Sequence, residues 1–424
     1  MNTRVLKKKD NVKLVMAASI GNFLEVFDFV VYAFFAKLIG ELFFSSSNPL
    51  LSSVIVFGVG FVMRPLGSLY LGSYADRHGR KASMLLSIML MALGSACIAF
   101  APTYQGMESM FSLGIIAPCF IIIGRLLQGF STGGEIGAAT TLLMESASPR
   151  SRGFYVSWQF TTQAFAAIAG SALGALLFWG LSDEQMYAWG WRIPFMLSLF
   201  IIPVGLYIRK NLDETYVEAE RHAKTAQAPI VEILRDHGLQ FIASIGMIIP
   251  GTMLTFTVTS FMPTFLQEVT TLPPEVTYLI SMASNVIVAV ANILGGLFYD
   301  RLPVRKYAII GLHLVSIALA GFMFVSTGNI MLFFSLLLLC SFVMGLAQPM
   351  KTTLVVEAFP VHVRATAMAV TYSLGVAIFG GTSQPVAVKL MEITGGNPVA
   401  PLYYLIPMTL IGVASYLLFK EKRA

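Results

Sequence analysis

Long apolar runs alternate with short polar segments along almost the whole chain. The runs span approximately residues 14–37, 51–73, 82–101, 113–143, 153–179, 191–208, 238–266, 275–298, 307–326, 330–355, 365–392 and 401–419. Because a bilayer-crossing helix needs about 20 mostly apolar residues, the pattern predicts an all-α integral membrane protein with twelve transmembrane helices. The first run is too long for the apolar core of a signal peptide and contains Glu25 and Asp28, so we expect an uncleaved first helix.

The composition agrees with a lipid environment. Of 424 residues, 56% are hydrophobic and 12% are charged, whereas soluble domains carry about 25% charged residues. This excludes an ordinary cytosolic enzyme, and twelve spans leave room for loops but not for a separate soluble domain. Cys97, Cys119 and Cys340 stand singly within apolar runs, so neither a disulfide framework nor a metal site is indicated.

The cations predict the orientation. Of the 28 Lys and Arg residues, 22 fall in the tails and in the loops after even-numbered spans, and the opposite loops contain none. By the positive-inside rule both termini are cytoplasmic. The net charge of +6 therefore reflects membrane topology, and we expect no nucleic-acid partner.

An internal repeat relates the two halves of the chain. The segment from Gly72 to Lys81, after span 2, and the segment from Gly296 to Lys306, after span 8, both read G-x-x-x-D-R followed by R-K. The second copy has one extra residue. Transporters are often built from such repeats, with the ligand site at the repeat interface.

A second pair of motifs supports the duplication. Glu145 and Arg152 follow span 4, and Glu357 and Arg364 follow span 10, each 212 residues further on. We therefore predict an N-terminal six-helix half over residues 1–208 and a C-terminal six-helix half over residues 238–424. A charged cytoplasmic loop over residues 209–237 would join them.

These motifs resemble those of a known family. The loop signature of the major facilitator superfamily, G-x-x-x-D-R-x-G-R-[RK], is matched at every position by the segment from Gly72 to Lys81. Within that superfamily the chain looks like the metabolite:proton symporter family. That resemblance is carried by G-N-F-L-E-V-F-D-F at 21–29, M-R-P-L-G at 63–67, G-R-L-L-Q-G-F at 124–130, W-G-W-R-I-P-F at 189–195 and I-F-G-G at 378–381.

The resemblance implies a function and a location. The segments at 21–25 and 153–159 resemble the citrate and tricarballylate branch, which is related to transporters of proline, betaine and 2-oxoglutarate. The implied activity is proton symport of a small organic carboxylate by alternating access in the bacterial inner membrane. We expect a monomer, with H⁺ as the coupling ion and no cofactor.

Few ionisable residues are predicted at membrane depth, and each is a functional candidate because such a residue costs about 2.5–3.5 kcal/mol at the bilayer centre. Counting about 1.5 Å per residue, three carboxylates and one arginine lie near the midplane, with a second arginine in the outer half of span 4. These five residues are Glu25, Asp28, Arg64, Glu135 and Arg125. On helical spacing, the residues of spans 1 and 4 form one polar stripe on each helix.

The stripes predict a water-accessible site for an anion. Arg64 or Arg125 would hold a substrate carboxylate, because a guanidinium binds it in bidentate fashion. Glu25, Asp28 or Glu135 would exchange the coupling proton. The alternative interpretation is a set of permanent ion pairs, for example Arg64 with Glu25 or Asp28, that hold the helices together.

Other polar residues are weaker candidates for substrate binding. Gln128, Gln163 and Gln384 could bond a substrate, although amides also join helices in lipid. Arg192, beside two tryptophans at 189 and 191, fits either an outer substrate contact or an interfacial anchor. Lys351 is expected to snorkel to the cytoplasm.

The repeated loops predict gating residues. In the first copy, Gly72 would permit close helix approach and Asp76 would cap a helix of the other half. The family resemblance implies that the loop charges latch the outward-open state. The full candidate set is Gly72, Asp76, Arg77, Arg80, Glu145 and Arg152, with Asp300, Arg301, Arg305, Glu357 and Arg364 in the second copy.

Other functions remain as alternatives. An intramembrane enzyme would need a nucleophile and base at one depth, or a metal-spaced cluster, and the five histidines supply neither. A membrane sensor would need a soluble output domain. Proton-coupled uptake of proline or betaine is the nearest alternative, although the four tryptophans lie near the membrane faces and offer no midplane cage for a quaternary ammonium.

Overall fold

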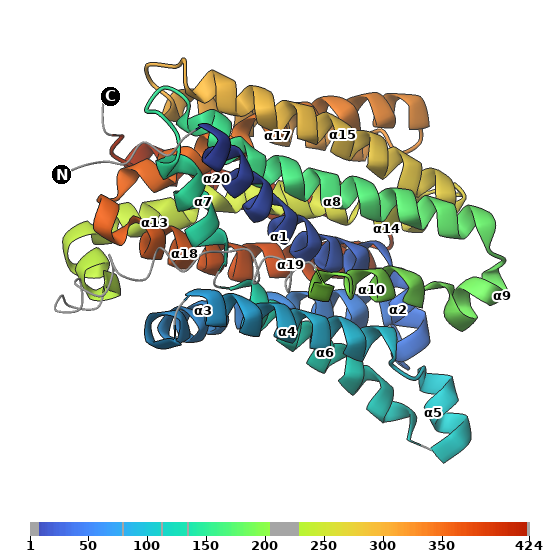
Figure 1. Ribbon diagram of the computed structural model, residues 1–424. Helices are drawn as coiled ribbons and strands as arrows, with labels where there is room; N and C mark the ends of the chain where they lie inside the picture. Colours follow the sequence, from blue (N-terminus) through green and yellow to red (C-terminus); the bar gives the residue numbers. More distant parts are fainter. Residues whose placement is uncertain (1–7, 79, 112, 134, 204–228, 422–424) are drawn as a thin grey trace.

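The computed structural model describes residues 8–78, 80–111, 113–133, 135–203 and 229–421. Every regular element in these ranges is helical. The helices run along one common direction, and the described part of the chain begins and ends toward the same end of the bundle (Figure 1). That end is the cytoplasmic one by the distribution of cations, and the short helices α5 and α9 lie at the opposite end.

The N-terminal half contains the helices that correspond to the first six predicted spans. The elements are α1 (Lys8–Phe34), α2 (Ala36–Phe43), α3 (Pro49–His78), α4 (Arg80–Ala99), α5 (Tyr104–Phe111), α6 (Ala117–Thr132), α7 (Glu135–Glu145), α8 (Arg152–Gly180), α9 (Asp183–Gln185), η2 (Met186–Gly190) and α10 (Arg192–Ser198). The predicted loop at 209–237 lies mostly outside the described residues.

The C-terminal half repeats this arrangement. Its elements are α13 (Pro229–Thr255), η4 (Phe256–Ser260), α14 (Met262–Val269), α15 (Pro274–Tyr299), α16 (Lys306–Val325), α17 (Ile330–Ala358), α18 (Val361–Gly375), η5 (Val376–Gly380), α19 (Gly381–Ile393) and α20 (Leu402–Leu418). The halves meet where α8 packs along α15 and α3 along α19.

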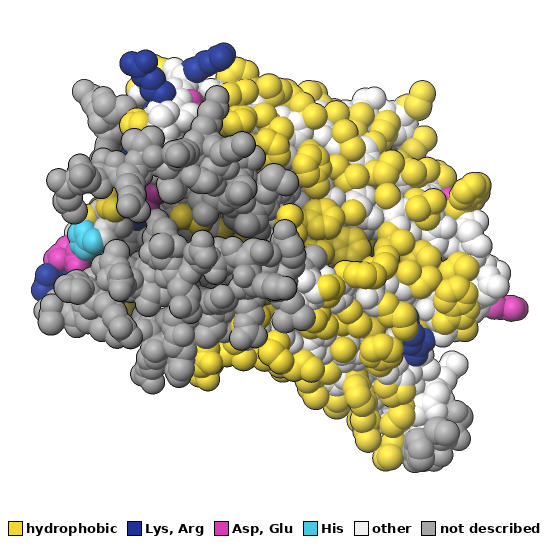
Figure 2. All heavy atoms as spheres, in the orientation of Figure 1, with side chains coloured by type: hydrophobic (Ala, Val, Ile, Leu, Met, Phe, Trp, Pro, Cys, Tyr) yellow, Lys and Arg dark blue, Asp and Glu magenta, His cyan; other side chains and the backbone are white. Residues whose placement is uncertain are grey.

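The helices have the length and the surface of membrane spans. In the described part of the chain, eight helices are long and apolar enough to cross a membrane, and two shorter apolar helices accompany them. Hydrophobic side chains dominate the coloured part of the visible face, and charged side chains lie toward its two ends (Figure 2). This surface is the lipid-facing belt that the composition requires.

Some predicted spans are divided. The run at 238–266 contains the π-helical segment η4, and the run at 365–392 contains η5. Such segments interrupt the regular backbone hydrogen-bond pattern, and single-turn π segments are frequent at functional sites. Both lie beside the central residues described below, since Gly380 of η5 faces Phe256 of η4.

A seam of glycines joins α3 and α6. A Cβ placed on Gly129 would lie 1.7 Å from the carbonyl oxygen of Gly60, and one on Gly67 would lie 1.9 Å from that of Phe130. Only glycine allows the two backbones to approach this closely. The seam fixes the relative position of Arg64 on α3 and Arg125 on α6.

Candidate functional site

A buried polar cluster lies between three helices of the N-terminal half. The Asp28 carboxylate on α1 accepts a hydrogen bond of 2.8 Å from the Gln128 amide on α6 and another from the Ser95 hydroxyl on α4. Asp28 and Gln128 are both fully buried, and the Ser198 hydroxyl of α10 also interacts with the carboxylate. The predicted stripes of spans 1 and 4 therefore face one another.

Arg125 is joined to this cluster through Gln128. Its Nη1 donates to Gln128 Oε1 at 2.8 Å, and its guanidinium carbon lies 4.2, 4.7 and 5.1 Å from the ring centroids of Phe29, Tyr32 and Phe57. The side chain is fully buried. Within the described residues it forms no direct ion pair, and its Nε has no hydrogen-bond partner. Its Nη2 also donates to the Phe57 carbonyl oxygen at 3.5 Å, so the guanidinium is stabilised by aromatic faces and by neutral acceptors.

Arg64 lies where the two halves meet. Its guanidinium carbon is 4.4 Å from the Phe61 ring centroid and 4.6 Å from that of Phe29. The Phe29 ring therefore contacts both Arg64 and Arg125. Arg64 interacts electrostatically with Glu25 of the N-terminal half and with Tyr372 of α18. Glu25, at 5% exposure, and Arg64, at 7%, are buried.

Some of the buried Asn and Gln side chains join helices by hydrogen bonds, whereas, within the described part of the chain, Gln384 does not. Asn22 and Gln159 join α1 to α8 by reciprocal hydrogen bonds of 2.9 Å. Gln163 of α8 bonds Tyr372 of the other half. Gln384 is fully buried, and both of its amide atoms lack partners among the described residues.

Arg192 lies apart from this cluster. At the outer end of the bundle it donates to the carbonyl oxygens of Ala188 at 2.8 Å and Ala101 at 3.0 Å. Its guanidinium lies 4.2 Å from the ring of Trp191. Trp191 is fully buried beside Phe43, so its ring fills the core of the N-terminal half and does not face lipid.

Several predicted residues cannot be placed in detail. The side chains of Glu135 and of the first-copy residues Gly72, Asp76, Arg77 and Arg80 lie outside the described residues. Their predicted roles stay predictions.

The second copy of the loop motif forms contacts between the halves at the cytoplasmic end. Asp300, just after α15, accepts hydrogen bonds from the backbone N–H groups of Gly153 at 2.7 Å and Phe154 at 3.0 Å, at the start of α8. Burial raises the pKa of the Asp300 carboxyl, and the two N–H groups partly oppose this effect. A Cβ on Gly296 would lie 2.4 Å from the Gly153 carbonyl oxygen, so the motif glycine permits this approach.

Glu357 is the centre of the charge network at this end. It accepts from Arg152 Nη1 at 3.0 Å, from the Tyr299 hydroxyl at 2.7 Å and from Arg305 Nη1 at 3.3 Å. The equivalent pair in the other turn is Arg364 with Glu145, at 3.3 Å. Arg301 is exposed, and within the described residues no contact joins it to this network.

Contacts at the outer end also join the halves, and sequence reasoning missed them. Lys37 Nζ lies 2.7 Å from Glu268 Oε1, and Asn48 donates to Glu392 at 2.8 Å. No repeated motif marks these residues. With both ends joined, the structure has the contacts of an occluded conformation.

Lys351 was interpreted wrongly. It is 1% exposed and does not reach the cytoplasmic surface. Helical side chains tilt toward the N-terminus of their helix, and α17 runs from the outer face to the cytoplasm. The lysine therefore points toward the middle of the membrane.

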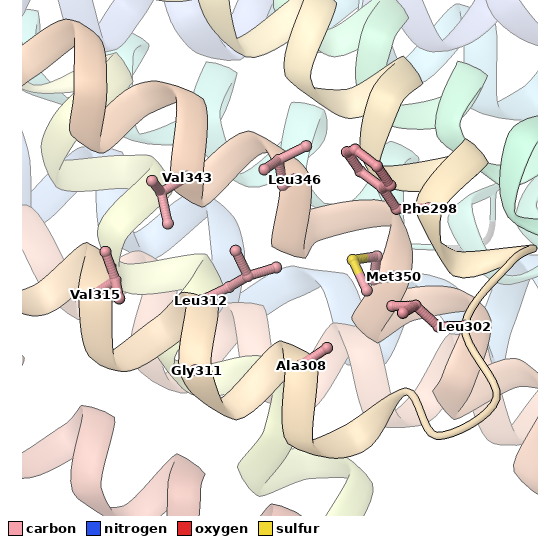
Figure 3. A pocket seen from close by; sticks show the side chains of 9 residues that line it. All are labelled: Phe298, Leu302, Ala308, Gly311, Leu312, Val315, Val343, Leu346 and Met350. Atoms are coloured by element: carbon pink, nitrogen blue, oxygen red, sulfur yellow. The ribbon is translucent and has the colours of Figure 1, made fainter.

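A groove of about 370 Å³ lies on the side of the C-terminal half, between α15, α16 and α17 (Figure 3). Its lining is wholly apolar and includes Phe298, Leu312 and Leu346. A groove with no polar donor cannot hold a carboxylate, so it belongs to the lipid-facing surface.

Comparison with known proteins places the chain in a family context. The family model described as Major Facilitator Superfamily matches residues 18–383. A citrate-proton symporter of Klebsiella pneumoniae is 33% identical over 92% of this chain and 88% of its own length. A proline/betaine transporter of Salmonella typhimurium is 30% identical over 96% of this chain and 83% of its own length.

A solved structure supports the fold. The xylose transporter XylE from E. coli, in a partially occluded inward-open conformation, has a TM-score of 0.73 with 96% of each chain covered. At 16% sequence identity, this likeness concerns the twelve-helix architecture alone.

Proposed function

The chain belongs to the Major Facilitator Superfamily, and we propose that it imports a small organic carboxylate together with protons by alternating access. As a member of this family it is a multi-pass transporter of the bacterial inner membrane, not an enzyme. Citrate, tricarballylate and dicarboxylates are the proposed substrates, H⁺ is the proposed coupling ion, and no cofactor is required.

The observation that carries the proposal is that Arg125 is buried without a carboxylate partner among the described residues. Its guanidinium is fully buried between aromatic rings and is bonded to a neutral amide, with no carboxylate in direct contact among the described residues. Buried charges are normally paired. An anionic substrate would supply the missing partner, and the fork of the guanidinium suits a carboxylate.

Asp28 is the proposed proton site. Its carboxylate receives neutral donors from Gln128 and Ser95, so it can carry either charge state without breaking an ion pair. Gln128 joins Asp28 to Arg125, and substrate binding at the arginine would therefore change the electrostatic environment of the acid. This connection gives a direct route for coupling.

The aromatic rings argue against the osmolyte alternative. Phe29, Tyr32, Phe57 and Phe61 could form a cage for a quaternary ammonium, but arginine guanidinium groups already lie against all four rings. A cationic ligand would have to displace a like charge. The site is therefore better suited to an anion than to the ammonium of betaine.

The test is uptake into proteoliposomes with labelled citrate, succinate, 2-oxoglutarate and betaine measured side by side. We expect uptake of at least one carboxylate, driven by an imposed pH gradient, inside alkaline. Betaine uptake without carboxylate uptake would overturn the substrate class. Carboxylate uptake that responds to a sodium gradient but not to the pH gradient would overturn proton coupling.

A further inference from the structure

Lys351 is a buried cation without a counter-charge. It lies on α17 at 1% exposure. In the described part of the chain, no hydrogen bond or ion pair holds its ammonium. The ionisable group that interacts with it electrostatically is His313, which cannot supply a negative charge. An isolated ammonium in a helix bundle in lipid is costly unless a ligand pairs with it.

The neighbouring helix is shaped around this ammonium. A Cβ on Gly251 of α13 would lie 2.3 Å from Lys351 Nζ, so the glycine provides the space that the ammonium occupies. The Gly251 carbonyl already accepts from Thr255 Oγ1 at 2.7 Å and from Gln348 Nε2 at 3.3 Å. The Gly251 carbonyl thus already has two donors, and among the described residues the Lys351 ammonium has no partner of its own.

Lys351 lies on α17, which packs against α8 of the N-terminal half. Its Cα is about 10 Å from the cytoplasmic end of α17 at 1.5 Å per residue, and the tilt of the side chain carries the ammonium toward the midplane. Phe256 follows Gly251 on the same span, and its ring centroid is 5.0 Å from that of Phe61. Arg64 also lies against Phe61, 4.4 Å from its ring centroid. The span that borders the Lys351 ammonium at Gly251 therefore also reaches the ring that Arg64 contacts.

We propose that Lys351 binds a second carboxylate of the substrate. One carboxylate would pair with the buried arginines of the N-terminal half and another with Lys351 of the C-terminal half. The transporter would thus select di- and tricarboxylates that bridge the two halves over monocarboxylates and zwitterions. This inference rests on the proposed function and makes it more specific.

The experiment compares a transported dicarboxylate with its monoamide, which has the same shape and one charge fewer. Succinate and succinamate serve if succinate is transported. In the wild type we expect the KM of the monoamide to be at least tenfold higher. In Lys351→Gln the KM of the dicarboxylate should rise by at least tenfold while that of the monoamide stays within about twofold, so that discrimination is lost.

Two further variants separate this role from a structural one. Lys389→Gln removes an exposed lysine of the same half that pairs with Glu392 and should leave discrimination unchanged. Gly251→Ala keeps Lys351 but displaces its ammonium, and it should reduce discrimination even if Lys351→Gln does not accumulate in the membrane.

The outcomes also separate the two proposals. Retained discrimination in both Lys351→Gln and Gly251→Ala, with normal carboxylate uptake, would overturn the role of Lys351 alone. Equal KM values for the two ligands in the wild type would do the same. Failure of the wild type to transport any carboxylate would contradict the proposed function and this inference together.

Discussion

The cytoplasmic and outer ends of the molecule are both joined across the halves, but by contacts of different kinds. At the cytoplasmic end Glu357 has three donors from two halves, and its side chain and that of Arg305 are 18% and 14% exposed. At the outer end the ion pair between the halves is Lys37 with Glu268, whose side chains are 36% and 35% exposed. The buried contacts there are neutral hydrogen bonds, from Tyr278 to the Phe34 carbonyl at 2.8 Å and from Thr264 to the Ala33 carbonyl at 3.4 Å.

This difference predicts unequal closing energies. An exposed ion pair contributes about 0–1 kcal/mol and is screened by salt, whereas a partly buried network of charge-assisted hydrogen bonds is stronger. Asp300 adds a helix cap that bridges the halves, because Gly153 and Phe154 belong to the first turn of α8. We therefore expect the occluded molecule to open outward more easily than inward.

The largest effect should come from Asp300→Asn. The substituted amide can accept one of the two backbone N–H groups but must place a donor against the other, at a cost of about 1–3 kcal/mol. We expect roughly 5- to 150-fold more inward opening. The measurement is labelling of Ser157→Cys, which lies beside Gly296, by a membrane-impermeant thiol reagent from the cytoplasmic side of inverted vesicles.

Asp236→Asn is the matched control for that variant. Asp236 is a cytoplasmic carboxylate whose recorded partner is its neighbour Arg235, so its removal should not change labelling. All labelling uses a background without Cys97, Cys119 and Cys340. Equal labelling in Asp300→Asn and Asp236→Asn would show that the cap does not hold the inner end closed.

Glu357→Gln should have the next largest effect. The neutral amide can still accept from Tyr299, but the ion pairs with Arg152 and Arg305 are lost. We expect inward opening to increase roughly five- to thirtyfold, from about 1–2 kcal/mol. In a double-mutant cycle with Arg152→Gln the effects should be non-additive; additive effects would mean that the pair contributes nothing to closure.

A smaller change is expected for Glu268→Gln at the outer end. Loss of one exposed pair should increase outward opening by no more than about fivefold. Thr264→Cys, whose side chain lies beside the Ala33 carbonyl in the closed state, reports this opening from the outer face. In the wild type, raising the salt concentration should reproduce part of the effect. An increase as large as that of Asp300→Asn at the inner end would contradict the expectation that the outer end is held closed more weakly than the cytoplasmic end.

Asn48→Ala should have the smallest effect. Its amide bond to Glu392 is exposed, and Glu392 also accepts from Lys389 at 2.8 Å, so the carboxylate keeps a partner. We expect outward opening to change by less than about twofold. Labelling of Thr264→Cys measures this change. An effect larger than that of Glu268→Gln would mean that Asn48, and not the Lys37–Glu268 pair, contributes more to closing the outer end.

Much of the fold could be predicted because lipid imposes simple rules. Apolar runs of about 20 residues become spans, and asymmetric cations orient them. The repeat also predicted which loops would carry the inner contacts, since Asp300, Glu357 and Arg152 are motif residues. The interruptions η4 and η5 were not predicted, because a π segment leaves the hydrophobic pattern unchanged.

The contacts within the site were only partly predictable. Helical spacing placed Asp28 and Gln128 on polar stripes, but it could not show that Gln128 lies between Asp28 and Arg125. The pairing of Lys37 with Glu268 joins residues far apart in sequence that no motif relates. The direction of Lys351, in contrast, follows from the polarity of its helix and could have been deduced from the topology.

The glycine seam between α3 and α6 has a mechanical consequence. With the Gly60 and Gly129 backbones in direct contact, neither helix can slide or rotate against the other without a steric clash. Arg64 and Arg125 should therefore travel as a rigid pair through the transport cycle. Spin labels on these two helices should keep one separation in every state, while the distances that change are those from this unit to the C-terminal half.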